Sequence, residues 1–255
     1  MEFLNVMFFA VILLAVVMES IDSSLGMMYG TILSPLLLGL GFDPKDVVPA
    51  LVISQAIGGI SASFQHHHFR NASFDWHSKD LKVAAVVFSM GILAVIVGAV
   101  IGVKVNKFVL SLYISVLMLV MGIIVFAGVK FRFSWNKIMV LGLVSSFNKA
   151  LSGGGFGPII TSGQMIVGRS SKRSVGATTM SEVEICIASF VAWWIISQRC
   201  PSLPLITALC VGAFVGGLIG PYILSRIKNI KLLTKLVAVM AIASGLFALI
   251  EIITK

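Results

Sequence analysis

Residues Leu151–Ile160 read Leu-Ser-Gly-Gly-Gly-Phe-Gly-Pro-Ile-Ile, and they lie inside a long apolar region near the middle of the chain. Glycine and proline weaken helix interiors, and backbone groups that are freed inside a lipid bilayer have no water to bond. The stretch therefore does not fit the interior of a simple membrane helix. It predicts a helix that ends and restarts within the apolar region.

The composition is that of an integral membrane protein. Of the 255 residues, 58% are hydrophobic and 11% are charged, whereas soluble domains are roughly 25% charged. The net charge of +9 fits basic cytoplasmic loops of a membrane protein better than nucleic-acid binding. The three cysteines lack metal-ligand spacing and form no disulfide framework, so we interpret them as packing residues and expect no cofactor.

Apolar segments recur along the whole chain and leave no room for a separate soluble domain. The first, Phe3–Met18, follows Glu2 and precedes no small-residue cleavage site, so we interpret it as a retained membrane element and not a secretory signal. The ten segments cover about residues 3–18, 31–41, 47–65, 81–103, 107–129, 136–148, 158–168, 174–197, 203–224 and 232–253.

Two of these segments are too short to span a membrane. Residues 31–41 and 158–168 would each form a helix of about 16 Å, against a bilayer core of about 30 Å. Each follows a break that contains glycine, Ser23–Gly30 in the first case and Ala150–Gly157 in the second. A slide of 127 residues places Gly26 on Gly153 and Gly30 on Gly157, with eight identities in thirty positions.

We interpret this match as an internal repeat, with residues 1–127 and 128–255 as its halves within one membrane domain. Lysines and arginines concentrate in four loops, which we place in the cytoplasm. Each repeat then has a broken, re-entrant helix pair and three full transmembrane helices. Because three crossings invert the second repeat, we predict an all-α polytopic protein with two inverted-topology repeats in the plasma membrane, its N-terminus outside.

Inverted repeats with discontinuous helices are a recurring transporter design, in which the substrate binds near the midplane where the breaks meet. Gly157-Pro158 predicts a helix start, because proline suits the first helical turn. Such a start presents free N–H groups and about half a positive charge to an anion. The candidate substrate-binding residues are Gly26, Met27, Met28, Tyr29, Gly30, Gln55, Lys149, Ser152, Gly153, Gly154, Gly155, Phe156, Gly157, Thr178 and Ser181.

Ionisable residues within the apolar segments are candidates for function. Glu182 and Gln55 are repeat mates, so one mate can carry a proton and the other cannot; Glu182 and Asp22 are our proton-coupling candidates. Lys149 is the mate of Asp22, and two interpretations stay open for it. It attracts the transported anion, or it forms an ion pair with Asp22 or Glu19.

The other polar residues have simpler explanations. Asn148, Ser152, Thr178 and Thr179 can donate to an anion, although such side chains commonly bond their own helix backbone. His66–His68 lack supporting carboxylates or cysteines, so we expect a solvated loop at the membrane edge and no metal site. The four tryptophans lie near segment ends, as interfacial aromatic residues do.

The two breaks and the repeat together resemble the sulfite exporter TauE/SafE family, also called the 4-toluene sulfonate uptake permeases. The resemblance rests on Gly26-Met-Met-Tyr-Gly30-Thr-Ile-Leu-Ser-Pro35, on Ser152–Ile159 and on Ser174–Glu184, and it covers essentially the whole chain. It implies transport of sulfur-containing anions such as sulfite, sulfoacetate or other organosulfonates, linked to the proton gradient. Met27, Met28 and Tyr29 depart from the family's run of glycines.

We therefore predict a non-enzymatic secondary transporter that holds a small anion at two facing helix N-termini and alternates access by rocking its repeats. Its partners are the anion, the lipid bilayer and protons, without nucleic acid; a homodimer is a further hypothesis. The alternatives are an anion channel on the same scaffold, a cation or metal transporter, and an intramembrane enzyme that uses Ser152. The last lacks a histidine at membrane depth, since all four histidines fall in one expected loop.

Overall fold

The computed structural model describes residues 2–40, 42–102, 132–198 and 201–253, with scattered positions between 104 and 127. The span expected at 107–129 thus lies largely outside the described residues. The regular elements of the described part are all helices, which confirms the all-α prediction. They are α1 (Glu2–Leu25), α2 (Tyr29–Gly39), α3 (Pro44–His68), α4 (Lys79–Gly102), α6 (Trp135–Ser152), α7 (Phe156–Ile166), α8 (Ser171–Ser197), α9 (Leu203–Arg226) and α10 (Ile230–Ile253).

Within the described residues, five helices are long and apolar enough to cross a membrane: α1, α3, α4, α8 and α9. The segments expected to be short are short: α2 and α7 have 11 residues each. These lengths support a multi-pass membrane protein in which α2 and α7 are too short to span.

Helix α1 extends well beyond the apolar segment that predicted it, from the expected end at residue 18 to Leu25. Serines allow this continuation, because their hydroxyls donate back to the helix itself. Ser20 Oγ lies 2.7 Å from the Val16 carbonyl oxygen and Ser23 Oγ lies 2.6 Å from that of Glu19. The last turns of α1 therefore carry polar residues into the protein interior.

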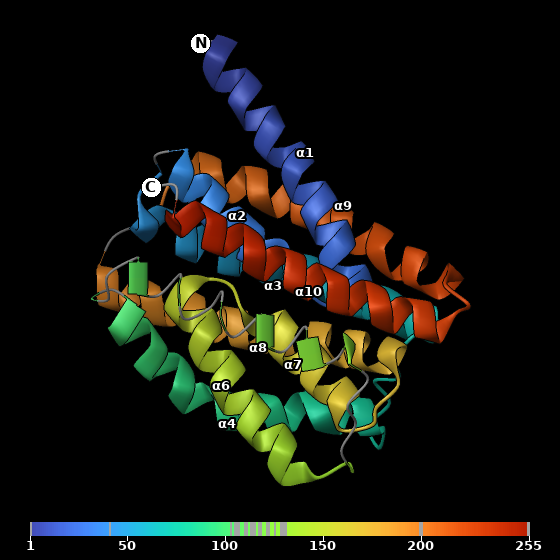
Figure 1. Ribbon diagram of the computed structural model, residues 1–255. Helices are drawn as coiled ribbons and strands as arrows, with labels where there is room; N and C mark the ends of the chain where they lie inside the picture. The colour runs from blue at the N-terminus through green and yellow to red at the C-terminus, as the bar shows by residue number, and fades with distance from the viewer. Residues whose placement is uncertain are drawn as a thin grey trace.

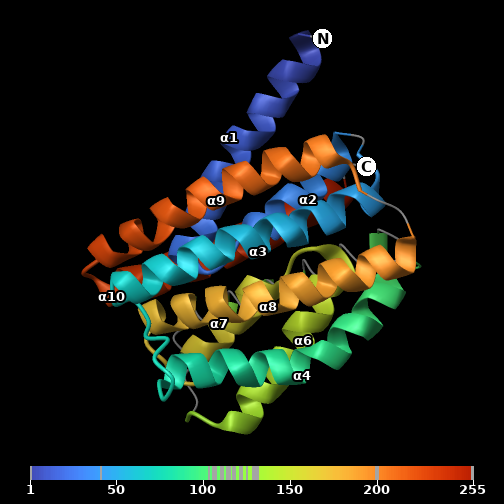
Figure 2. The ribbon, with the colours of Figure 1, turned by 180° about the vertical axis from the view of Figure 1, so that it is seen from behind.

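The helices of the two sequence halves are interleaved (Figures 1 and 2). Helix α9 packs along α1 and α3, while α4 packs along α6 and α8, and α3 contacts α8. Under the 127-residue slide, α1, α3 and α4 correspond to α6, α8 and α9. Each of these contacts is therefore matched by an equivalent contact in which the halves exchange roles.

Glycines permit the close crossings of the long helices. A Cβ atom built on Gly98 or Gly102 of α4 would lie 2.5 Å from a backbone carbonyl oxygen of α6, and one on Gly212 of α9 would lie 2.5 Å from the Ile12 carbonyl oxygen of α1. Real Cβ contacts are not this short. The helix backbones thus touch where the sequence has its small residues, and the short helix α7 is buried along its whole length.

Candidate functional site

The two breaks adopt the left-handed backbone conformation that glycine tolerates best. Gly26, which follows α1, has φ +78°, and Gly153, which ends α6, has φ +75°. Gly155 has φ +76° and precedes α7 as its N-cap. Other residues pay an energetic cost at such angles. The glycines therefore allow each chain segment to leave one helix and start another within a few residues.

The breaks lie directly against each other in a reciprocal way. A Cβ atom on Gly30 would collide with the carbonyl group of Gly153, and one on Gly157 would collide with that of Gly26. Since Gly26 corresponds to Gly153 and Gly30 to Gly157, the two collisions are equivalent under the 127-residue slide. The glycines of each break thus allow a close approach of the other break.

Hydroxyl groups join the breaks to the short helices that cross them. Ser34 Oγ of α2 donates to the Ser152 carbonyl oxygen at 3.2 Å, and Thr161 Oγ1 of α7 donates to that of Gly26 at 2.8 Å. Sequence reasoning missed both residues. The sequence nevertheless holds a signal that could have identified them, because Ser34 and Thr161 are 127 residues apart and both carry a hydroxyl.

A buried network of polar side chains lies beside the breaks. Lys149 Nζ lies 2.8 Å from Glu182 Oε1 and also donates to Gln55 Oε1. Gln55 Nε2 in turn donates to Asp22 Oδ2 at 3.4 Å. All four residues are at most 5% exposed. Two pairs of residues that are 127 positions apart, Asp22 with Lys149 and Gln55 with Glu182, thus form one continuous chain of contacts.

The ion-pair partner of Lys149 is not one of the two residues expected from the sequence. Asp22 and Glu19 were the partners expected in the ion-pair interpretation, and the structure places the Glu182 carboxylate beside Lys149 instead. The reason is that Glu182 lies on α8, which packs against α6 and its Lys149. Among the described residues, Gln55 links Asp22 to Lys149 by hydrogen bonds to both.

Other polar atoms near the network are buried without a partner. Oε2 of Glu19 and both side-chain polar atoms of Asn148 have no hydrogen bond within the described part of the chain. Glu19 is 1% exposed and Asn148 is 0% exposed. Buried polar groups usually have hydrogen-bond partners. The unpartnered atoms of Glu19 and Asn148 could therefore bond to a ligand or to water.

The starts of the two short helices differ in one decisive respect. Asp22 Oδ1 accepts a hydrogen bond of 2.8 Å from the Tyr29 N–H at the start of α2. Helix α7 has Gly155 as its N-cap, and the N–H groups that precede it donate to neutral hydroxyls: Gly154 to Ser152 Oγ at 3.2 Å and Gly155 to Thr31 Oγ1 at 3.4 Å. At the position of Asp22, the second half has the cation Lys149. The start of α2 is therefore bonded to the protein's own carboxylate, whereas no carboxylate among the described residues bonds the start of α7.

The aromatic pair expected to line the pocket is fully buried. Tyr29 packs among Leu33, Leu51 and other apolar residues, and its hydroxyl lies 2.8 Å from Ser54 Oγ. Phe156 belongs to a separate apolar cluster with Ile160. Both side chains thus belong to the apolar core that surrounds the breaks.

The remaining predicted residues fall on both sides of the crossing. Met27 and Met28 pack against Met165 and Leu224. The hydroxyl oxygens of Thr178 and Thr161 lie 3.0 Å apart, which links α8 through Thr161 to the first break. Gly154 contacts the backbone of Gly30. Ser152 and Ser181 donate to carbonyl groups of their own helices, those of Asn148 and Thr178.

The structure corrects the expected positions of one histidine and one tryptophan. His66 is fully buried in the last turn of α3, not in a solvated loop, and its ring meets the backbone of Ser23. Trp193 is buried as well, and its Nε1 donates to the Ala150 carbonyl oxygen at 2.6 Å. His66 and Trp193 are repeat mates, as are Ser23 and Ala150. Each ring therefore supports the end of the helix that leads into a break.

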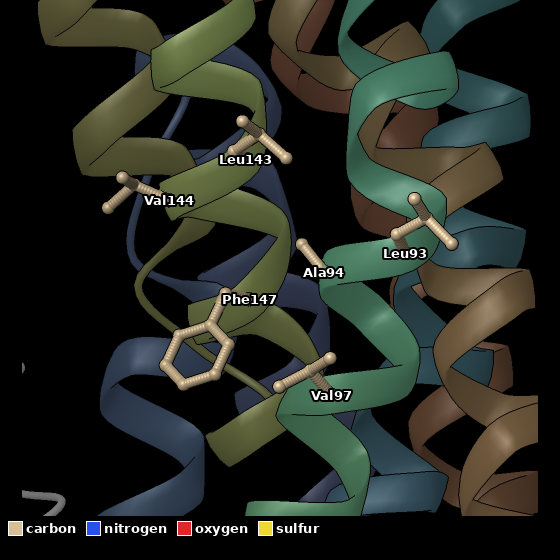
Figure 3. Close-up of a pocket in the computed structure, with 6 residues that line it drawn as sticks. All are labelled: Leu93, Ala94, Val97, Leu143, Val144 and Phe147. Carbon is tan, nitrogen blue, oxygen red and sulfur yellow. The ribbon is translucent and has the colours of Figure 1, made fainter.

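A groove between α4 and α6 has a volume of about 350 Å³ and is shown in Figure 3. Its lining consists of apolar side chains: Leu93, Ala94, Val97, Leu143, Val144 and Phe147. Such a lining offers no side-chain donor to an anion. The candidate site is therefore the polar network at the crossing and not this groove.

Comparisons with known proteins agree with this architecture. The chain is 24% identical over 185 residues to a Bacillus subtilis (strain 168) protein described as "Probable membrane transporter protein YtnM". That match covers 67% of the chain and 59% of the relative, so the chain spans less than two thirds of that protein's length. The family model described as "Sulfite exporter TauE/SafE" matches residues 11–248. The chain therefore belongs to the sulfite exporter TauE/SafE family.

Proposed function

We propose that the protein is a membrane transporter of small sulfur-containing anions, such as sulfite, sulfoacetate or other organosulfonates. Family membership supports the substrate class. The observation that carries the proposal is the difference between the two helix starts. The Asp22 carboxylate accepts a hydrogen bond at the start of α2, whereas the N–H groups just before α7 donate to neutral hydroxyls and Lys149 occupies the position equivalent to Asp22.

In this proposal, the transported oxyanion takes at α7 the place that the Asp22 carboxylate has at α2. The start of α7 contributes N–H groups and the positive end of the helix dipole. Lys149 Nζ contributes a charge-assisted hydrogen bond, the stronger kind in a buried setting. The unpartnered amide of Asn148, one turn before the break, is a further donor. Ser152, Thr178 and Ser181 are proposed to complete the site.

The Lys149–Glu182 pair suggests how protons are coupled to the anion. When Lys149 turns to the anion, Glu182 loses its counter-ion inside the membrane. An unpaired buried carboxylate is costly, and a proton removes that cost. Glu182 would thus take up a proton as the anion binds, and Asp22 would serve as a second proton site through Gln55.

The interleaved helices supply a means of alternating access. We propose that residues 1–127 and 128–255 are inverted repeats that rock against each other about the crossing of the breaks. The reciprocal glycine contacts support this relationship, because a pseudo-two-fold axis would produce them. The cell membrane, with the basic loops in the cytoplasm, is the proposed location.

The first test is a thermal-shift panel on the purified chain with sulfite, sulfate, sulfoacetate, taurine, phosphate and acetate. A sulfur oxyanion should stabilise the wild type, and should stabilise a Lys149→Gln variant much less. Stabilisation by a divalent metal and by none of the anions would refute the proposal. Saturable counterflow of labelled anion in proteoliposomes then separates a transporter from a channel.

A further inference from the structure

A second polar cavity lies at one end of the helix bundle, away from the crossing of the breaks. It has a volume of about 350 Å³ and is lined by His67, Arg70, Ala72, Ser73, Asp75 and Arg173. Most of these residues belong to the connection between α3 and α4, and Arg173 comes from the first turn of α8. Both α3 and α4 are candidate membrane spans. The cavity therefore lies at a membrane surface.

The charges around the cavity are mainly positive. Within the described residues, the guanidinium groups of Arg70 and Arg173 have no carboxylate within ion-pair distance. The one acidic side chain of the lining, Asp75, is 78% exposed and lies 4.0 Å from His67 Nε2. Two unpaired guanidiniums in one cavity repel each other unless an anion lies between them. The lining thus favours an anionic ligand.

Hydrogen bonds hold the walls of the cavity in place before any ligand arrives. Asp80 accepts from the Ser73 N–H at 2.9 Å and also pairs with Arg169, four residues before Arg173. Asn71 donates from its side chain to the Pro221 carbonyl oxygen at 2.8 Å. The connection that bears Arg70 is thereby fixed to α4, to α9 and to the turn that precedes α8. This preorganisation lowers the entropic cost of binding.

The surroundings of the cavity match the interface between lipid and water. Trp76, in the same connection, is 84% exposed, and Phe64, one turn before the end of α3, is 73% exposed. Aromatic side chains of this kind are enriched at the level of the lipid headgroups. Basic pockets between membrane helices are suited to anionic headgroups.

We propose that this cavity binds a phosphate group, with Arg70 and Arg173 as its ligands, and that the group belongs to the headgroup of an anionic phospholipid. The site is independent of the proposed anion transport. Arginine suits phosphate because its planar guanidinium can donate two parallel hydrogen bonds. His67 donates from Nε2, since its Nδ1 accepts from the Phe74 N–H at 3.1 Å.

The test uses the full chain, purified in detergent, and measures bound phospholipid by native mass spectrometry. The probes are dioleoyl phosphatidylglycerol, dioleoyl phosphatidylcholine and inorganic phosphate. Phosphatidylglycerol should be retained in preference to phosphatidylcholine. Arg70→Gln and Arg173→Gln should each reduce that retention about threefold to tenfold. Asp75→Asn should increase it, because the variant removes the one negative charge from the lining.

The matched control is Lys104→Gln, since Lys104 is exposed and follows the opposite end of α4. It should leave the retention of phosphatidylglycerol unchanged. If inorganic phosphate stabilises the chain in an Arg173-dependent way and the lipid does not, the phosphate site stands and its source is a free anion. Equal retention of lipid by the wild type and both arginine variants, without an effect of phosphate, would overturn the proposal.

Discussion

The first and second breaks have closely similar backbones and opposite electrostatics. Gly26 and Gly153 share a left-handed φ, and each break receives a hydroxyl hydrogen bond from the short helix of the other half. Yet the residue before the first break is Asp22 and its counterpart is Lys149. The first helix start therefore faces a carboxylate of the protein itself, whereas the second is the one at which we propose that an external anion binds. In this proposal, similar backbones serve different tasks because one pair of side chains differs in charge.

The largest expected effect comes from removing the cation that distinguishes the second break. Lys149→Met should weaken anion binding about a hundredfold, because a charge-assisted hydrogen bond contributes about 1.5–3 kcal/mol. It should also destabilise the protein by about 3–5 kcal/mol, since Glu182 loses its buried partner. Anion titration and detergent-based unfolding measure the two effects.

The double variant Lys149→Met/Glu182→Gln serves as its control. It leaves no unpaired charge from this ion pair, so it should regain most of the stability and none of the anion affinity. A Lys149→Met protein that transports at the wild-type rate would contradict the assignment of Lys149 to the anion.

The reciprocity of the breaks is tested by adding a methyl group to each. Gly30→Ala and Gly157→Ala should each lower the free energy of unfolding by about 3 kcal/mol, because both new Cβ atoms meet backbone of the opposite break. Gly153→Ala is the control. Its Cβ would lie 3.6 Å from Leu51 and Val48, so only the strain at positive φ, about 1 kcal/mol, remains. If Gly30→Ala and Gly157→Ala lowered the free energy of unfolding by clearly different amounts, the two contacts would not be equivalent.

A smaller effect is expected at the first break. Asp22→Asn keeps an acceptor near the Tyr29 N–H and removes its charge, which should cost about 1 kcal/mol of stability. Anion affinity should rise about threefold, because one negative charge leaves the network that contains Lys149. Unfolding experiments measure the change in stability, and an anion titration measures the change in affinity. A large loss of affinity would show instead that the anion depends on the first break.

The smallest effect concerns the support of the helix ends. Trp193→Phe removes the hydrogen bond to the Ala150 carbonyl group and should cost about 1 kcal/mol in thermal unfolding. The neighbouring Trp194 is 57% exposed, and Trp194→Phe should leave the unfolding unchanged. Equal effects of the two variants would argue against a supporting role of the buried ring.

Much of the helical framework follows from apolar segment lengths alone. The two segments of eleven residues predicted the short helices α2 and α7. The end of α1 did not follow, because serine hydroxyls that bond their own helix let polar residues extend it to Leu25. The burial of His66 did not follow either, since burial depends on what packs against the residue.

For the candidate site, the sequence by itself determined the composition and the pairing of repeat mates. It identified the glycines of both breaks, the exchange of Asp22 for Lys149 and that of Gln55 for Glu182. Only the tertiary structure decided which of these residues touch. Hydrophobic patterning fixes which helices form, but contacts between buried charges depend on how the helices cross. That geometry places the Lys149 ammonium beside the Glu182 carboxylate and the Asp22 carboxylate at the start of α2.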